Sequence, residues 1–101
     1  MKKFKDLEFN IHPWTRRGVH ATVDTGKGLS ISVAAGHGLH STPGGIHKDE
    51  EEFKLDPTEA DFSSFEVGIK DRSLPIQEQE WEIFGWQSRE EIDKILEKHS
   101  K

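Results

Sequence analysis

Two short runs of alternating apolar residues flank a glycine-containing turn in the first third of the chain, and they limit the folds open to it. The two runs are Val19, Ala21, Val23 and Leu29, Ile31, Val33. Alternation with a period of two places such residues on one face of a strand. Because residues 24–28 can form a loop of about five residues, the pattern predicts a β-hairpin with one buried face.

The same alternation predicts three more strands. One covers Leu7 to Ile11 and ends at Pro13, because proline cannot continue a ladder of backbone hydrogen bonds. A second contains Phe65, Val67 and Ile69, and a third contains Trp81 and Ile83, which we expect to face inward. We therefore assign Trp81 to the core.

A helix is predicted at the end of the chain. Ser88 and Glu91 fit a capping box, in which each side chain accepts a hydrogen bond from the other residue's backbone N–H. Ile92, Ile95 and Leu96 then form one apolar stripe. Strands followed by one helix predict an α+β fold, an antiparallel sheet of four or five strands with the C-terminal helix packed on one face.

The regular pattern is missing in the middle of the chain. Residues 36–45 are rich in glycine and proline, and the acidic run after them has little to bury. We expect a long Gly/His-rich and acidic loop over residues 36–64, within a single domain that covers residues 1–101. The chain has no cysteine, which excludes disulfides and thiolate chemistry, and this suits a cytoplasmic protein.

Charge divides the chain into two unlike parts. Residues 1–47 carry six Lys/Arg and three Asp/Glu, whereas residues 48–101 carry eight and sixteen, so a part near +3 precedes a part near −8. A net charge of −5 argues against nucleic-acid binding, which depends on neutralised phosphates. The acidic segment instead fits a host protein with a basic surface. Its candidate partner-binding residues are Asp49, Glu50, Glu51, Glu52, Asp56, Glu59 and Asp61.

Exposed aromatic side chains are the other candidate contacts, because large aromatic residues often dominate interface energies. Trp14 and Trp86 are predicted partner-binding residues, and Phe53 and Phe62 are further candidate anchors. Self-association into a homo-oligomer is also open. The alternative to protein binding is a small-ligand or metal site in the Gly/His loop 36–47, where imidazoles can bind zinc, nickel or copper.

That alternative depends on His37, His40 and His47, which lie in a glycine-rich loop that does not fix ligand geometry. We therefore predict no metal and no cofactor. No hydrolase arrangement, nucleotide fingerprint or phosphate-binding loop is present in the sequence, so no catalytic residue is assigned and the chain is predicted not to be an enzyme.

Several motifs resemble those of a group of small phage-encoded proteins of unknown function. They are residues 9–13 (FNIHP), 18–21 (GVHA), 28–33 (GLSISV) and the ending 81–92 (WEIFGWQSREEI). The resemblance covers about half the chain, and residues 36–64 depart from it. It implies a shared fold and an accessory protein that acts on a bacterial host factor, such as a defence or nucleic-acid-processing protein.

Overall fold

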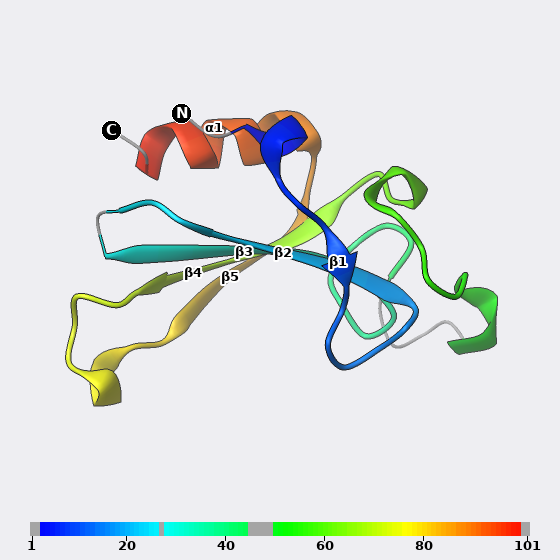
Figure 1. Ribbon diagram of the computed structural model, residues 1–101, viewed down its shortest axis with the longest axis horizontal. Helices are drawn as coiled ribbons and strands as arrows, with labels where there is room; N and C mark the ends of the chain where they lie inside the picture. Colours follow the sequence, from blue (N-terminus) through cyan, green and yellow to red (C-terminus); the bar gives the residue numbers. More distant parts are fainter. Residues whose placement is uncertain (1–2, 27, 45–49, 100–101) are drawn as a thin grey trace.

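The protein is a five-stranded antiparallel sheet with one helix over one of its faces (Figure 1). This computed structural model describes residues 3–26, 28–44 and 50–99. The strands lie in the sheet in chain order. They are β1 (Asn10–Ile11), β2 (Gly18–Asp24), β3 (Leu29–Gly36), β4 (Phe65–Asp71) and β5 (Trp81–Gln87), followed by α1 (Arg89–His99). The α+β architecture agrees with the sequence prediction.

The predicted hairpin is formed by β2 and β3. Val19 lies opposite Ala35, and Ala21 lies opposite Val33, so the apolar residues of both strands share one face. In the turn, the Gly26 N–H donates to Oδ1 of Asp24 over 2.9 Å, and Gly26 has a φ of 78°. Such a positive φ suits glycine because it has no Cβ.

The helix α1 covers this apolar face. Ile92 and Leu96 are buried in one cluster with residues from β2, β3 and β4. The capping box is confirmed: the Glu91 N–H donates to Ser88 Oγ (3.1 Å), and the Ser88 N–H donates to Glu91 Oε1 (3.0 Å). No helix in the described part of the chain is long and apolar enough to cross a bilayer.

The N-terminal strand is shorter than predicted. Only Asn10–Ile11 of the expected Leu7 to Ile11 are in the strand. A 3₁₀ turn, η1 (Phe4–Asp6), precedes this segment, and the Phe4 N–H donates to Oδ1 of Asp93 on α1 over 2.7 Å. Leu7 is buried, because η1 lies against α1 and completes the cover of the core. Ile11 stays 39% exposed, since β1 forms the edge of the sheet.

The prediction that Trp81 and Ile83 face inward is wrong. They are 42% and 50% exposed, because they lie opposite Lys70 and Gly68 on the face away from α1. Phe84, which lies on the other face of β5, packs against the core instead. The prediction of Phe53 and Phe62 as interface anchors is also wrong, since each is only 4% exposed.

The connection between β3 and β4 contains two short 3₁₀ turns, η2 (Glu50–Glu52) and η3 (Glu59–Asp61). An isolated bridge between Thr42 and Ser64 joins the two ends of the connection beside the sheet. A further 3₁₀ turn, η4 (Ile76–Glu78), lies between β4 and β5. Figure 1 shows η2 and η3 at one end of the molecule, beside the β1–β2 loop, and η4 at the other end.

Candidate functional site

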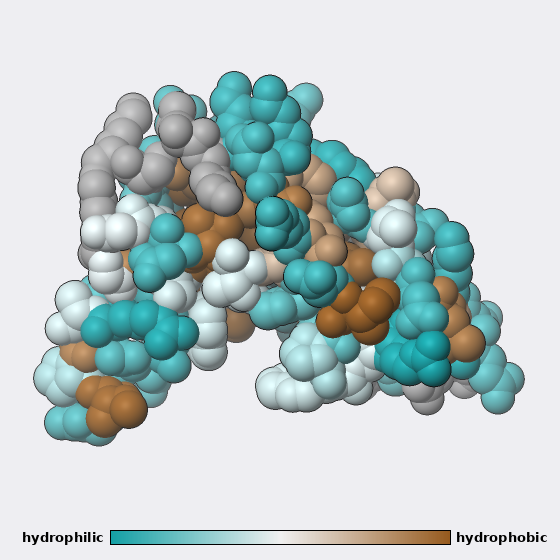
Figure 2. Space-filling model, in the orientation of Figure 1, coloured by the Kyte–Doolittle hydropathy of each residue, from teal (hydrophilic) through white to brown (hydrophobic). Residues whose placement is uncertain are grey.

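The face of the sheet opposite α1 has a groove with a volume of about 380 Å³. Its middle is hollow because the strands carry small side chains there: Ser32 lies opposite Gly68, and Ala34 lies beside them on β3. Figure 2 shows this hollow underside between the β4–β5 connection and the β1–β2 loop. The residues that line it are His12, Pro13, Trp14, His20, Ser32, Ala34, Leu39, Glu66, Gly68, Trp81 and Ile83.

Gly68 shapes one wall of the groove. A Cβ at this position would stand 3.0 Å from the Trp81 ring and 3.2 Å from the end of the Ile83 side chain. Glycine therefore lets these two side chains lie down across β4. The Lys70 ammonium lies 5.5 Å from the centre of the Trp81 ring, so this indole already contacts a cation.

Two histidines form the wall near β1. Their rings are 5.7 Å apart, and Nε2 of His20 is hydrogen-bonded to Oγ of Ser32 over 3.0 Å. The backbone N–H of Trp14 donates to Nδ1 of His12 over 3.1 Å. A neutral His12 therefore carries its proton on Nε2. Burial lowers the pKa of both imidazoles, and the nearby His20 lowers the pKa of His12 further. Both are therefore neutral at neutral pH.

The Glu66 carboxylate lies at the opposite side of the groove. Its Oε1 accepts a hydrogen bond from Nδ1 of His40 over 2.7 Å, and its side chain is 18% exposed. The His40 ring in turn contacts the Trp86 ring, with their centres 5.1 Å apart. The predicted contact residue Trp86, 61% exposed, is thereby linked to the rim of the groove.

An extra residue in β5 brings Trp86 to this position. The pairing shifts between Val67 opposite Phe84 and Phe65 opposite Gln87, which is a β-bulge. Trp86 has a φ of 53°, and its N–H donates to the His40 carbonyl over 2.9 Å. A positive φ is costly for a bulky residue, and such strain is typical of functional positions.

Trp14, the other predicted aromatic contact, is 89% exposed at the tip of the β1–β2 loop. The same loop is held against the acidic segment. The Arg16 guanidinium donates to both carboxylate oxygens of Asp56, at 3.3 and 2.8 Å, and the Asp56 N–H donates to the Arg16 carbonyl over 2.7 Å. Arg17 also donates to the Phe53 carbonyl over 2.6 Å. Trp14 and the acidic segment therefore belong to one end of the molecule.

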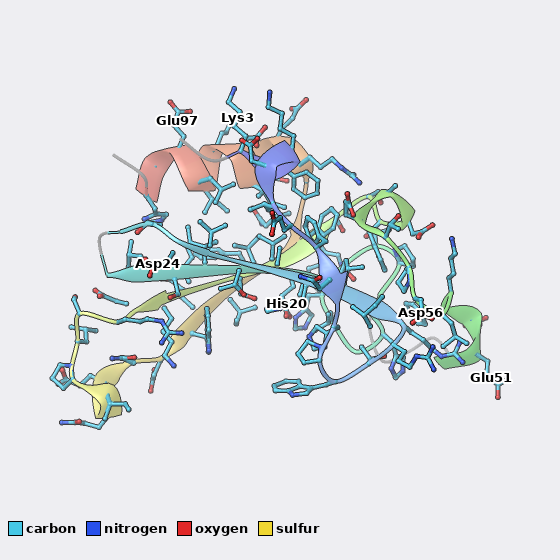
Figure 3. All side chains as sticks on the ribbon, in the orientation of Figure 1. Lys3, His20, Asp24, Glu51, Asp56 and Glu97 are labelled. Carbon is cyan, nitrogen blue, oxygen red and sulfur yellow. The ribbon has the colours of Figure 1, made fainter. Side chains whose placement is uncertain are left out.

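The predicted acidic residues differ in their surroundings. Glu51 is exposed, and Figure 3 shows it near Asp56 at the end of the molecule. Asp61 lies 3.7 Å from the Lys54 ammonium and accepts the Thr58 N–H over 2.8 Å; this hydrogen bond is the main cause of its lowered pKa. Glu59 is half-buried. Asp49 and the Glu50 side chain lie outside the described residues.

The histidines considered for a metal site point to different partners. The His37 ring contacts the Phe53 ring, with centres 5.4 Å apart, whereas His40 pairs with Glu66. His47 lies outside the described residues. Within the described ranges, no group of three or more His, Asp or Glu side chains is arranged to hold a metal ion.

The glycine-rich loop uses its own polar groups. Ser41 is 4% exposed, accepts the Gly36 N–H over 2.9 Å and donates to the Pro43 carbonyl over 2.9 Å. Its hydroxyl thus holds the loop together. Leu39 of the same loop lines the groove, so residues 36–44 contribute a wall to a site that is centred on the sheet.

Sequence reasoning missed the groove and its residues His12, His20 and Glu66. The available signal was the set of small and polar residues between the apolar ones of the hairpin, such as Ser32 and Ala34. Comparisons with protein-family models, curated proteins and solved structures found no match to this chain.

Proposed function

We propose that this chain is a non-enzymatic accessory protein of phage type that binds a bacterial host protein in the cytoplasm through an acidic surface. A defence or nucleic-acid-processing protein is the expected kind of host factor. The observation that carries the proposal is the position of Trp14, which is 89% exposed on a loop that Arg16 ties to Asp56 in the acidic segment. An aromatic anchor and a charged surface then meet the partner together.

The charge of this surface favours a basic partner. Arg16 offsets the charge of Asp56, and Lys54 lies near Asp61, but the segment as a whole stays acidic, because residues 49–61 carry seven Asp/Glu and one Lys. Clustered charge of one sign accelerates association with a surface of opposite sign, and salt weakens this effect. The long connection over residues 36–64 is the proposed carrier of this contact surface.

The proposal assigns no catalytic residue. Ser41, which follows His40 in the sequence, makes its hydrogen bonds with backbone groups of its own loop. Nε2 of His20 lies 3.0 Å from the Ser32 hydroxyl and 3.4 Å from the Thr22 hydroxyl, whereas a Ser–His–acid triad also needs a carboxylate that orients the imidazole.

The test is capture of a partner from a bacterial lysate, followed by binding kinetics with the purified partner. Reversing Glu50, Glu51 and Glu52 to Lys should slow association at least tenfold, and raising the salt concentration should weaken the parent complex. Reversing Glu78, Glu80 and Glu82, at the other end of the molecule, makes the same charge change and serves as the control.

The two triple variants should therefore differ. Equal association rates for both, with no dependence on salt, would remove the acidic surface from the proposal. Trp14→Ala should act mainly on the dissociation rate, because a packed anchor holds the formed complex. An unchanged dissociation rate would exclude Trp14 as an anchor.

A further inference from the structure

We propose that the groove on the open face of the sheet receives an arginine side chain of the partner, with its guanidinium on the Glu66 carboxylate and against the indoles that line the groove. The inference rests on the proposed function in one respect, that the arginine belongs to a bound protein. The acidic surface selects only a basic partner, whereas the groove selects one type of partner side chain.

Charge selects a cation as the occupant. Among the described residues that line the groove, only Glu66 carries a formal charge at neutral pH, because burial lowers the pKa of both His12 and His20. Its Oε1 accepts both hydrogen bonds that it makes with described residues, from Nδ1 and from the backbone N–H of His40 (2.7 and 3.5 Å). This leaves Oε2 for a donor from a ligand, and a carboxylate bonds most strongly to a charged donor.

The aromatic walls select a cation as well. Trp14 and Trp81 line the groove. Because the Lys70 ammonium already lies 5.5 Å from the centre of the Trp81 ring, the exposed Trp14 ring is the better face for a further cation. The Arg89 guanidinium makes the same kind of contact with Phe4 and Phe65, at 5.0 and 5.2 Å. Aromatic faces attract cations, and the flat guanidinium also stacks on them.

Shape and polarity favour arginine over lysine. The floor is made of small residues, Ser32, Ala34 and Gly68, so a flat group can lie along it. In either tautomer of His20, the oxygen of the hydrogen-bonded Ser32 hydroxyl keeps a lone pair that can accept from a ligand in the groove. A guanidinium has five N–H donors in one plane, whereas an ammonium is a compact and more strongly hydrated charge.

The experiment uses the whole protein and a fluorescein-labelled peptide of three Gly-Arg repeats, followed by fluorescence anisotropy. The same peptide with citrulline replaces the guanidinium by a neutral group of nearly equal shape. We expect the citrulline peptide to bind at least roughly tenfold more weakly than the arginine peptide. A third peptide, with lysine in place of arginine, should have an affinity between these two.

Two variants of groove residues and one control variant test the assignment. Glu66→Gln keeps the shape and an acceptor for His40 but removes the charge, and it should weaken binding of the arginine peptide roughly tenfold. Glu82→Gln removes a charge from the opposite face of the same sheet and should leave binding unchanged. Trp14→Ala, at a side chain 89% exposed, should also weaken binding without affecting the fold.

Three results would overturn the inference. They are equal binding of the arginine and citrulline peptides, equal effects of Glu66→Gln and Glu82→Gln, and tighter binding of a twelve-nucleotide oligo-dT than of the arginine peptide. The last result would indicate a single-stranded nucleic acid on the exposed indoles instead.

The outcome separates this inference from the proposed function. Peptide binding that depends on Glu66, together with partner binding that ignores residues 50–52, would leave the groove as an arginine site and reject the acidic surface. Partner binding that depends on residues 50–52, with no discrimination between the two peptides, would retain the acidic surface and reject the arginine pocket.

Discussion

The two faces of the sheet are built from different residues, although the same strands form both. On the face toward α1, Val19, Ile31, Val33 and Val67 are at most 1% exposed. On the other face, the small residues Ser32 and Ala34 of β3 and Gly68 of β4 form the middle of the groove, and larger tryptophan and histidine side chains line it on either side. The first arrangement fills space, whereas the second leaves a groove. The residues that stabilise the fold therefore lie on the covered face, and those that are available for binding lie on the open face.

The connections follow the same division. At the end near α1, η1 is attached to the helix by the Phe4 to Asp93 hydrogen bond (2.7 Å) and supports the core. The β1–β2 loop instead turns Trp14 outward beside the acidic segment. All three tryptophans are more than 40% exposed, at 89% for Trp14, 42% for Trp81 and 61% for Trp86. Large aromatic residues that are not used in the core are therefore gathered on the open side.

The largest expected effect is at the covered face. Replacing Leu96, 2% exposed in the core cluster, by alanine should lower the free energy of unfolding by about 2–5 kcal/mol, because it removes buried apolar contacts and leaves a cavity. Urea unfolding followed by circular dichroism measures this. Ile76→Ala, at a side chain 84% exposed in η4, is the control and should change stability by less than about 0.5 kcal/mol. Similar midpoints for both variants would make α1 peripheral.

A smaller effect is expected at the start of the helix. Ser88→Ala removes the hydroxyl that accepts the Glu91 N–H over 3.1 Å, and it should cost about 1 kcal/mol. Ser88→Thr keeps an acceptor and should recover most of the loss. The same unfolding measurement tests both, and an alanine variant as stable as the parent would show that packing alone fixes α1.

The elements that the sequence predicted well are those that local rules determine. The β2–β3 hairpin depends on alternation around a glycine turn, and the helix start depends on Ser88 and Glu91, three residues apart. Such rules could not predict which face of β5 is buried. Alternation shows that Trp81 and Ile83 share a face, but Phe84 offers an apolar residue on the other face, and only tertiary packing decides which is buried.

The groove was hidden for a related reason. Trp14, Trp86 and the acidic segment could be selected by residue type, whereas His12, His20 and Glu66 come from three separate places in the chain. They share a groove because His20 lies opposite Ala34 and Ala34 lies opposite Glu66. This cross-strand register follows from the pairing of β2, β3 and β4, and no single segment determines it.

The smallest expected effect is a dependence of stability on pH that comes from the open face. The pKa values of His12 and His20 are lowered from 6.5, mainly by burial. As the pH falls below 6.5, these imidazoles therefore bind protons more readily in the unfolded chain than in the folded chain. The stabilisation from these histidines is thus complete above pH 6.5 and is lost as the pH falls below it. We expect the free energy of unfolding to decrease between pH 7.5 and pH 5.5.

Replacing both His12 and His20 by glutamine, which cannot titrate, should reduce this decrease. The carboxylates with lowered pKa, such as Asp61 and Glu91, titrate below this range, since their ordinary values are 3.8 and 4.5. They also remain in both proteins, so the difference between the two pH profiles isolates the imidazoles. Urea unfolding at several pH values measures it. Parallel profiles for the parent and the double variant would mean that the open face leaves its histidines as well hydrated as in the unfolded chain, and the contrast between the two faces would then be one of shape alone.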